Sequence, residues 1–279
     1  MKKNVLIIGK RSFIGSNLFI FIKKKLKVKL ISIENFKKLT SRSLSKFSII
    51  INCSINKNYI NKKYKLKNDY DLLVAKKIKN LQSKFVLIST RKVYKPKFNI
   101  SEKGQLMPKC NYSRNKLKSE RLAIKILDNR LLILRVANIV GQPKKNKRKI
   151  HRTFSDIFFD QAKKGYIYKN TNNYKDFISI KKFCEITLKL IQINSHGIYN
   201  VSLGKKVYLH QLVKWLNYYN NKQTITLNVK KSFNKDCFTL NNYKLMKKIK
   251  IKNSTKELKK ASLELSKSFF KYKYFKSYE

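Results

Sequence analysis

The sequence predicts an α/β protein, in which a doubly wound parallel sheet is followed by a smaller α+β lobe. Three observations support this fold class. A short apolar strand runs directly into a glycine loop and an apolar helix within the first 23 residues. Strand-like and helix-like segments then alternate as far as residue 136, and the alternation stops after Gly141. Because right-handed crossovers join parallel strands, we expect helices on both faces of the sheet.

The elements of the first half follow from apolar runs and helical periodicity. Short runs rich in β-branched residues predict strands at residues 5–8, 28–33, 47–53, 85–89 and 131–136. Helices are predicted at residues 13–23, 69–81 and 111–127. The second strand is expected to end at Glu34. We assign residues 1–141 to the first domain, with later contributions near residues 175–201.

Residues 142–279 are expected to form mainly the second lobe. Helical periodicity marks residues 154–164, 180–191, 209–218 and 255–265, and strand-like runs mark residues 166–168 and 197–201. Residues 143–152 read as a basic loop. The tail, residues 269–279, alternates Lys with Phe and Tyr, and we expect its aromatic rings to pack on the lobe. Docking on an anionic membrane surface is the alternative.

Composition predicts a folded, cytoplasmic protein. The chain is 42% hydrophobic and 12% aromatic, which is far from a disordered composition. No apolar run reaches the length of a transmembrane helix, and the N-terminus lacks the features of a signal peptide. The three histidines form no metal-ligand pattern, so no metal site is expected. Four cysteines without paired spacing are expected to be thiols: Cys53, Cys110, Cys184 and Cys237.

The formal net charge is +53, from 67 basic and 14 acidic residues. The lysines spread from Lys2 to Lys276 instead of forming one basic block, and only nine of the basic residues are arginine. This distribution favours a chain-wide bias in residue usage over a dedicated polyanion site. Non-specific binding to polyanions at low salt is expected in either case. A polyanion-binding protein is therefore kept as an alternative function.

The first functional motif is the glycine loop from Gly9 to Gly15. Two of the seven glycines of the chain stand six residues apart, where a strand turns into a helix. Gly9 permits the tight turn, and Gly15 lets the helix pack close to the sheet. Ser12 stands where a middle glycine is common, and its hydroxyl could donate to a phosphate. The helix N-terminus behind the loop favours an anion, which predicts a dinucleotide site of the Rossmann type.

The choice between NAD and NADP depends on two conflicting residues. Glu34 follows Gly9 by 25 residues, and a carboxylate there accepts hydrogen bonds from the adenosine ribose, which favours NAD. Arg11 in the loop, aided by Lys37 or Lys38, could meet the 2′-phosphate of NADP instead. We favour NAD slightly and keep both cofactors open.

The catalytic candidates are Thr90, Tyr112 and Lys116. Tyr112 and Lys116 lie four residues apart, hence on one face of the predicted helix, where the ammonium would lower the tyrosine pKa. The spacing alone means little, because it recurs elsewhere, for example at Tyr218 and Lys222. The position of the pair gives it weight. Thr90 ends the fourth strand, at the edge of the sheet where ligands of open α/β folds bind.

These segments resemble the extended short-chain dehydrogenases/reductases, and more narrowly the NAD-dependent epimerase/dehydratase group that acts on nucleotide sugars. The glycine loop, the Ser-Thr-x-x-Val-Tyr segment at residues 89–94 and the Tyr-x-x-x-Lys pair fall in the order and spacing of that family. Three later segments extend the resemblance: Leu-Arg-Val-Ala-Asn-Ile-Val-Gly at 134–141, Lys-Asp-Phe-Ile at 175–178 and Gly-Ile-Tyr-Asn-Val at 197–201. Together they cover about residues 3–215.

The resemblance implies a role for each motif. Thr90, Tyr112 and Lys116 would be the catalytic set, with Tyr112 moving a proton during hydride transfer at a sugar carbon. Thr90, Asn138 and Lys175 would contact the nucleotide-sugar substrate. The family has arginine where this chain has Lys175, which keeps the charge and loses the forked geometry. A homodimer is compatible with the resemblance. The expected cofactor-binding set is Gly9, Arg11, Ser12, Phe13, Ile14, Gly15, Glu34, Cys53 and Lys116.

Departures from the family pattern narrow the expected reaction. The 4,6-dehydratases of this family carry Asp-Glu after the catalytic Thr, whereas Arg91 and Lys92 follow Thr90 here. We therefore predict an epimerase or a reductase. The alternative on the same fold is a catalytically idle or regulatory cofactor-binding protein, which would keep the glycine loop without needing the catalytic set.

Overall fold

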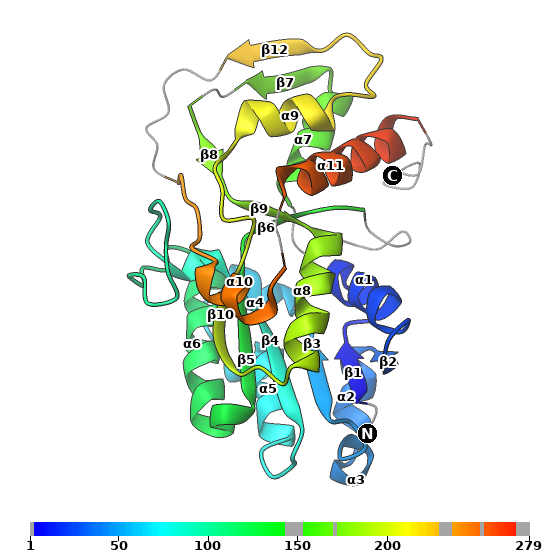
Figure 1. Cartoon of the computed structure of the whole chain (residues 1–279), viewed down its shortest axis with the longest axis vertical. Helices are drawn as coiled ribbons and strands as arrows, with labels where there is room; N and C mark the ends of the chain where they lie inside the picture. The colour runs from blue at the N-terminus through cyan, green and yellow to red at the C-terminus, as the bar shows by residue number, and fades with distance from the viewer. Residues whose placement is uncertain (1–2, 143–152, 170–171, 229–235, 252–253, 272–279) are drawn as a thin grey trace.

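The computed structural model describes residues 3–142, 153–169, 172–228, 236–251 and 254–271 (Figure 1). The predicted basic loop at residues 143–152 and the end of the tail lie outside the described residues.

A six-stranded sheet forms the core of the first domain. Its strands are β1 (Asn4–Ile8), β2 (Lys27–Ile31), β3 (Ile49–Asn52), β4 (Lys84–Thr90), β5 (Leu131–Val136) and β10 (Gly197–Val201). Their order is β10-β5-β4-β3-β1-β2, and every neighbouring pair is parallel. The chain crosses from β2 over β1 to β3, so the connections change direction between β1 and β3. Ligands of doubly wound sheets bind at such a switch point.

Helices cover both faces, as the alternation along the chain predicts. Successive residues of β1 serve opposite faces: Val5 and Ile7 belong to one apolar cluster, and Leu6 and Ile8 to the other. The first cluster is covered by α1 (Phe13–Ile22), α8 (Ile180–Gln192) and α10 (Tyr243–Ile249). The second is covered by α2 (Ile33–Lys38), α3 (Ser41–Leu44), α5 (Tyr70–Lys77) and α6 (Asn111–Leu127). The fold is the expected Rossmann-like doubly wound sheet.

The second lobe has its own apolar core. It packs α7 (Phe154–Lys163), α9 (Leu209–Leu216) and α11 (Thr255–Phe270) around buried side chains such as Phe158, Leu212 and Leu258. Three two-stranded sheets complete it: β6 (Asn138–Val140) with β9 (Phe177–Ser179), β7 (Tyr166–Lys169) with β12 (Ile225–Asn228), and β8 (Tyr174–Lys175) with β11 (Val207–Tyr208). Phe269 stacks on Phe159 at 4.1 Å between ring centroids, so the described start of the tail packs on the lobe.

The lobe stands over the carboxyl ends of the parallel strands (Figure 1). β5 ends at Val136 and the chain continues almost directly into β6, whose Val140 belongs to the core of the lobe. Because all six strands run in the same direction, their carboxyl ends share this edge. The lobe therefore lies next to the edge at which the sequence predicts the site.

Three expectations about elements need correction. β2 ends at Ile31, so Glu34 does not end the strand but lies in the first turn of α2, which Ser32 caps by accepting from Asn35 N–H. The helix predicted at residues 69–81 is shorter, because Asp69 caps it and it ends at Lys77. The short strands β6, β8, β11 and β12 and the helix α10 were not predicted, since two- to four-residue strands carry too little periodicity to detect.

Candidate active site

The glycine loop adopts a backbone that few residues other than glycine tolerate. Gly9 has φ +124°, outside the region favoured by side-chain-bearing residues. A Cβ on Gly15 would lie 2.6 Å from Gly9 O and 3.2 Å from Cys53 Cβ. Both glycines therefore allow the loop, the start of α1 and the end of β3 to meet closely. Cys53 lies at this meeting point, and burial raises the pKa of its thiol.

The start of α1 is a fitting cradle for a diphosphate. Ser12 is the N-cap, and its Oγ accepts from Gly15 N–H at 3.2 Å. Helix geometry leaves the N–H groups of Phe13 and Ile14 without a carbonyl partner in the helix. No acidic residue stands in the first turn to compete with a bound anion. The hydroxyl of Ser12, expected to face a phosphate, is thus also part of the helix cap.

Glu34 and Arg11 lie near each other beyond the ends of β1 and β2. Glu34 is exposed on the first turn of α2. Backbone and Ser32 hydrogen bonds lower the pKa of its carboxyl, and the charges of Lys37 and Arg11 lower it further. The position predicted for the adenosine ribose therefore holds one carboxylate, with two cations close enough to act on its charge.

Thr90 and Tyr112 come together at the carboxyl edge of the sheet. Thr90 is the last residue of β4, and Tyr112 is the second residue of α6, which begins there. Thr90 lies close enough to Tyr112 to lower the pKa of its phenol. Thr90 Oγ1 accepts from Lys92 N–H at 3.2 Å, which fixes its orientation. Tyr112 is half-buried at this edge of the sheet.

Lys116 lies one turn along α6 from Tyr112 and is held by two contacts. Its Nζ donates to Asp71 Oδ2 at 2.7 Å and to the Ile88 carbonyl at 2.8 Å. Asp71, from α5, also accepts from Asn52 Nδ2 at 2.7 Å at the end of β3. The side chains of Lys116 and Asp71 are 7% and 4% exposed, so this is a buried ion pair that fixes the lysine beside the tyrosine.

The ion pair changes the expected proton affinity of Tyr112. The sequence predicts that Lys116 lowers the tyrosine pKa, and its charge does act in that direction. Burial outweighs it and raises the pKa of Tyr112, and the carboxylate of Asp71 raises it further. Asp71 was not among the predicted residues. Two observations could have pointed to Asp71. It is one of only 14 acidic residues, and it stands in the first turn of a buried helix.

The predicted substrate residues lie at the start of the lobe. Asn138 opens β6, and its Nδ2 donates to the Asp176 carbonyl at 3.2 Å. Lys175 ends β8, and its Nζ donates to Asp236 Oδ2 at 2.7 Å. Asp236 also accepts a fork from Arg91, with Nη1 at 3.0 Å and Nη2 at 3.2 Å. Two cations, one from each part of the molecule, thus meet on one carboxylate.

Asp176, next to Lys175, organises this junction from inside. Its side chain is fully buried and accepts from Leu240 N–H at 2.9 Å and from Gly204 N–H at 3.2 Å. Burial raises the pKa of Asp176 to about 7, although these hydrogen bonds act in the opposite direction. The carboxyl therefore connects three separate segments around β8 and β9.

Other residues of the family-like segments form a buried polar network. Arg135 donates from Nη2 to Glu120 Oε2 at 2.6 Å and from Nη1 to Tyr94 OH at 2.9 Å. Tyr94 OH donates to Asn200 Oδ1 at 2.9 Å, and Ser89 Oγ donates to Glu120. Ser89, Arg135, Asn200 and Glu120 come from β4, β5, β10 and α6, and Tyr94 follows the end of β4 by four residues. The segments that resemble the family thus include residues at the carboxyl edge of the sheet, such as Thr90 and Tyr112, and buried polar residues, such as Arg135, that help to hold the strands together.

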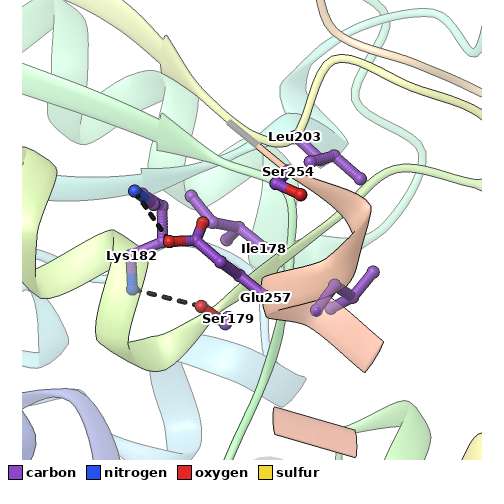
Figure 2. Close-up of a pocket in the computed structure, with 7 residues that line it drawn as sticks. Ile178, Ser179, Lys182, Leu203, Ser254 and Glu257 are labelled. Atoms are coloured by element: carbon purple, nitrogen blue, oxygen red, sulfur yellow. Dashed lines mark hydrogen bonds and ion pairs between the residues drawn. The ribbon is translucent and has the colours of Figure 1, made fainter. Parts of the chain in front are cut away.

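A small cavity lies elsewhere, between α8, β9 and α11 (Figure 2). Its volume is about 10 Å³, roughly one water molecule. Lys182 pairs there with Glu257 at 3.1 Å. None of the predicted site residues lines it, so it belongs to the junction between the domain and the lobe.

Two further properties concern the residues that the structure describes. Within them, no group of three or more His, Cys, Asp or Glu side chains is arranged to hold a metal ion. None of their helices has both the length and the apolar character that a membrane crossing needs.

The sequence of residues 5–202 matches the model of the NAD dependent epimerase/dehydratase family. Among curated proteins, no sequence match is found. Several solved structures share the fold. UDP-N-acetylglucosamine 4-epimerase from Methanobrevibacter ruminantium, solved with UDP-N-acetylmuramic acid, is similar with a TM-score of 0.76 and 19% identity over 96% of this chain and 99% of that one.

Two others are similar in the same way. The dTDP-glucose 4,6-dehydratase from Bacillus anthracis, solved with NAD, has a TM-score of 0.75 and 14% identity over 96% of each chain. RMD from Pseudomonas aeruginosa, solved with NADPH, has a TM-score of 0.73 and 16% identity over 96% of this chain and 99% of that one. At these identities the likeness shows a common fold.

Proposed function

Because the chain belongs to the NAD dependent epimerase/dehydratase family, we propose that it is an NAD(P)-dependent epimerase or reductase that acts on a nucleotide sugar. The observation that carries this proposal is that Thr90 and Lys116 both lie close enough to Tyr112 to act on its phenol, with the Lys116 ammonium fixed one turn away by Asp71. An idle cofactor-binding protein would not need this arrangement. The set lies at the strand edge that also carries the glycine loop.

The proposed cofactor residues fit a dinucleotide. Gly9 and Gly15 leave room that a Cβ would fill, and the N–H groups of Phe13 and Ile14 point from a helix start that lacks acidic residues. Arg11, Ser12, Glu34, Cys53 and Lys116 complete the set. A bound nicotinamide would supply the hydride acceptor or donor. We favour NAD slightly because of Glu34; the similar structures solved with NAD and with NADPH support a nicotinamide cofactor of either kind.

In this proposal the protein's own part is to hold the sugar and move one proton. The Tyr112 hydroxyl takes or gives the proton of the reacting sugar oxygen, and Thr90 hydrogen-bonds the same region of the substrate. Lys116, oriented by Asp71 and the Ile88 carbonyl, favours the phenolate that forms when the proton leaves. Its reach to the nicotinamide ribose is part of the same proposal.

The substrate is proposed to lie between the two parts of the chain. Residues 1–141, with contributions near 175–201, would form the cofactor domain, and residues 142–279 would form mainly the substrate lobe. Asn138 and Lys175, at the start of the lobe, are proposed to contact the substrate. Arg91 and Lys92 follow Thr90 where the family's 4,6-dehydratases carry Asp-Glu, which argues against dehydration.

The test is to isolate the full chain, identify any cofactor released on denaturation, and incubate the protein with a panel of UDP-, dTDP- and GDP-sugars plus NAD, NADPH or neither. We expect a nicotinamide cofactor and conversion of at least one sugar, detected by chromatography of the products. Cofactor binding without turnover of any sugar would favour the idle alternative. Absence of both would refute the proposal.

A further inference from the structure

A row of aromatic side chains crosses the two-stranded sheet of β8 and β11. Tyr174 and Tyr208 are register partners in that sheet, with ring centroids 6.0 Å apart. The ring of His210 lies 5.7 Å from the ring of Tyr208. At the other end of the row, Lys206 Nζ lies 4.9 Å from the centroid of the Tyr174 ring and 4.8 Å from that of Phe98. These five residues are called the aromatic strip.

The aromatic strip faces solvent. Phe98 is 55% exposed and Tyr208 is 39% exposed, and His210 is exposed as well. Successive residues of a strand point to opposite faces of the sheet, and Val207, next to Tyr208, is completely buried in the core of the lobe. The partner of Val207 across the sheet is Lys175, so the strip lies on the face opposite to this proposed substrate residue.

The surroundings of the aromatic strip are basic. The segments that carry it, residues 95–99, 172–175 and 205–214, hold lysine at six positions and contain no aspartate or glutamate. Among the residues that the structure describes, no carboxylate forms an ion pair with Lys206. The strip therefore presents exposed aromatic rings together with positive charge that no neighbouring acid neutralises.

Rings and ammonium groups in one row fit a single-stranded nucleic acid. Its unpaired bases stack on exposed aromatic rings, and lysines neutralise the phosphates that link them. A bilayer surface fits less well, because surfaces that enter a membrane also present aliphatic side chains. In these segments Val207 and Leu212 are buried, and Leu209 and Val213 are half-buried. An inorganic polyphosphate would use the lysines but not the rings.

We propose that the aromatic strip binds single-stranded nucleic acid, with bases stacked on Phe98 and Tyr208 and phosphates held by Lys206 and the neighbouring lysines. This binding goes beyond the proposed function and does not depend on it, since the strip and Lys175 lie on opposite faces of the sheet. The high net charge of the chain attracts any polyanion, and the rings of the strip select single strands.

The test uses the full chain and a fluorescently labelled oligothymidylate of about 12 nucleotides, a length within the range of known single-strand sites. Binding is followed by fluorescence anisotropy at about 200 mM salt, where non-specific contacts are weak. Phe98→Ala and Tyr208→Ala keep the charge, and we expect each to weaken binding about tenfold, as for loss of one stacked base. Tyr243→Ala is the matched control, because Tyr243 is 70% exposed on α10, outside the strip, and should leave the affinity unchanged.

Lys206→Met tests the electrostatic part of the proposal. It should weaken binding and reduce the slope of the affinity against salt concentration by about one ion. An unchanged slope would show that Lys206 contacts no phosphate and would overturn the assigned arrangement.

Three further outcomes would overturn the proposal and leave the proposed function intact. Equal binding by wild type and the two ring variants would mean that charge alone holds the oligonucleotide. Equal affinity of the wild type for inorganic polyphosphate or duplex DNA at the same salt would mean that the rings do not read unpaired bases. Binding to phosphatidylserine vesicles without binding to the oligonucleotide would assign the strip to a membrane surface.

Discussion

Two buried ion pairs lie one turn apart on α6, and they differ in what surrounds them. Glu120 pairs with Arg135 at 2.6 Å, and Lys116 pairs with Asp71 at 2.7 Å. The Arg135 pair is enclosed by other protein groups, since Tyr94 and Ser89 complete its hydrogen bonds. The Lys116 pair lies beside Tyr112, which is half-buried at the carboxyl edge of the sheet. The two pairs therefore have different roles. The Arg135–Glu120 pair helps to hold neighbouring strands together, and the Lys116–Asp71 pair sets the electrostatic environment of the Tyr112 hydroxyl.

The largest expected effect concerns Tyr112, which lies beside the Lys116–Asp71 pair. Tyr112→Phe removes the proposed acid and base while keeping the ring, and we expect a loss of turnover of about 10²- to 10⁴-fold with little change in melting temperature. The measurement is the rate on the sugar found by the substrate panel. Tyr218→Phe is the control, because Tyr218 shares the spacing to a lysine but is 66% exposed. Equal rates for wild type and Tyr112→Phe would refute the assigned role.

Breaking the Arg135–Glu120 pair should lower the stability of the fold. Arg135→Met leaves the Glu120 carboxylate buried without its cation, and we expect a loss of about 3–5 kcal/mol in the free energy of unfolding. Chemical denaturation measures it. The double variant Arg135→Met with Glu120→Gln removes the stranded charge and should recover part of the loss. If the double variant is as unstable as the sum of two single variants, the pair does not act as a unit.

Asp71→Asn tests how the Lys116–Asp71 pair affects the pKa of Tyr112. Removing the carboxylate leaves the positive charge of Lys116 unopposed, which lowers the pKa of Tyr112. The pH at which the rate changes as Tyr112 ionises should therefore move to lower pH. Asp69→Asn is the matched control, since Asp69 is equally buried and caps the same helix but bonds Ser119 and Tyr64 instead of Lys116. A pH profile that shifts equally in both variants would contradict the specific role of Asp71.

The smallest effect concerns the junction to the lobe. The folded-state pKa of Asp176, about 7, is above that of an unfolded aspartate, so its contribution is fully present at low pH and is lost as the pH rises through 7. Lowering the pH from 8 to 6 should stabilise the protein by about 1 kcal/mol through this carboxyl. Asp176→Asn should remove that part of the pH dependence. Denaturation at both pH values measures it, and an unchanged dependence would show that another group is responsible.

The sequence predicted the first half of the fold well because each long element carries its own periodicity. The helix at residues 111–127 is found with those bounds. Glu34 shows where such prediction ends. Ser32 can cap a helix as readily as it can continue a strand, and the local sequence does not show which of the two conformations is adopted. The short strands β6, β8, β11 and β12 were missed for a related reason, because their pairing depends on distant partners.

Part of the candidate site was likewise predicted from the sequence and part was not. Thr90, Tyr112 and Lys116 were predicted from their places along the chain, and the structure brings Thr90 and Lys116 close enough to Tyr112 to act on its pKa. The acidic partners of the basic residues were not predicted. Asp71, the partner of Lys116, is 45 residues away from it, and Asp236, the partner of Arg91, is 145 residues away. No local pattern links residues so far apart.

The sequence by itself determined the parallel α/β architecture, the glycine loop and the family, because these depend on periodicity and short motifs. Only the tertiary structure decided the electrostatics of the site. It brings Asp71 to Lys116, so that burial and this carboxylate raise the pKa of Tyr112 despite the neighbouring ammonium. It also brings Asp236 between Arg91 and Lys175. Charge interactions depend on distance and burial in space, and in a chain with 67 basic residues spacing along the sequence does not show which of them meet an acid.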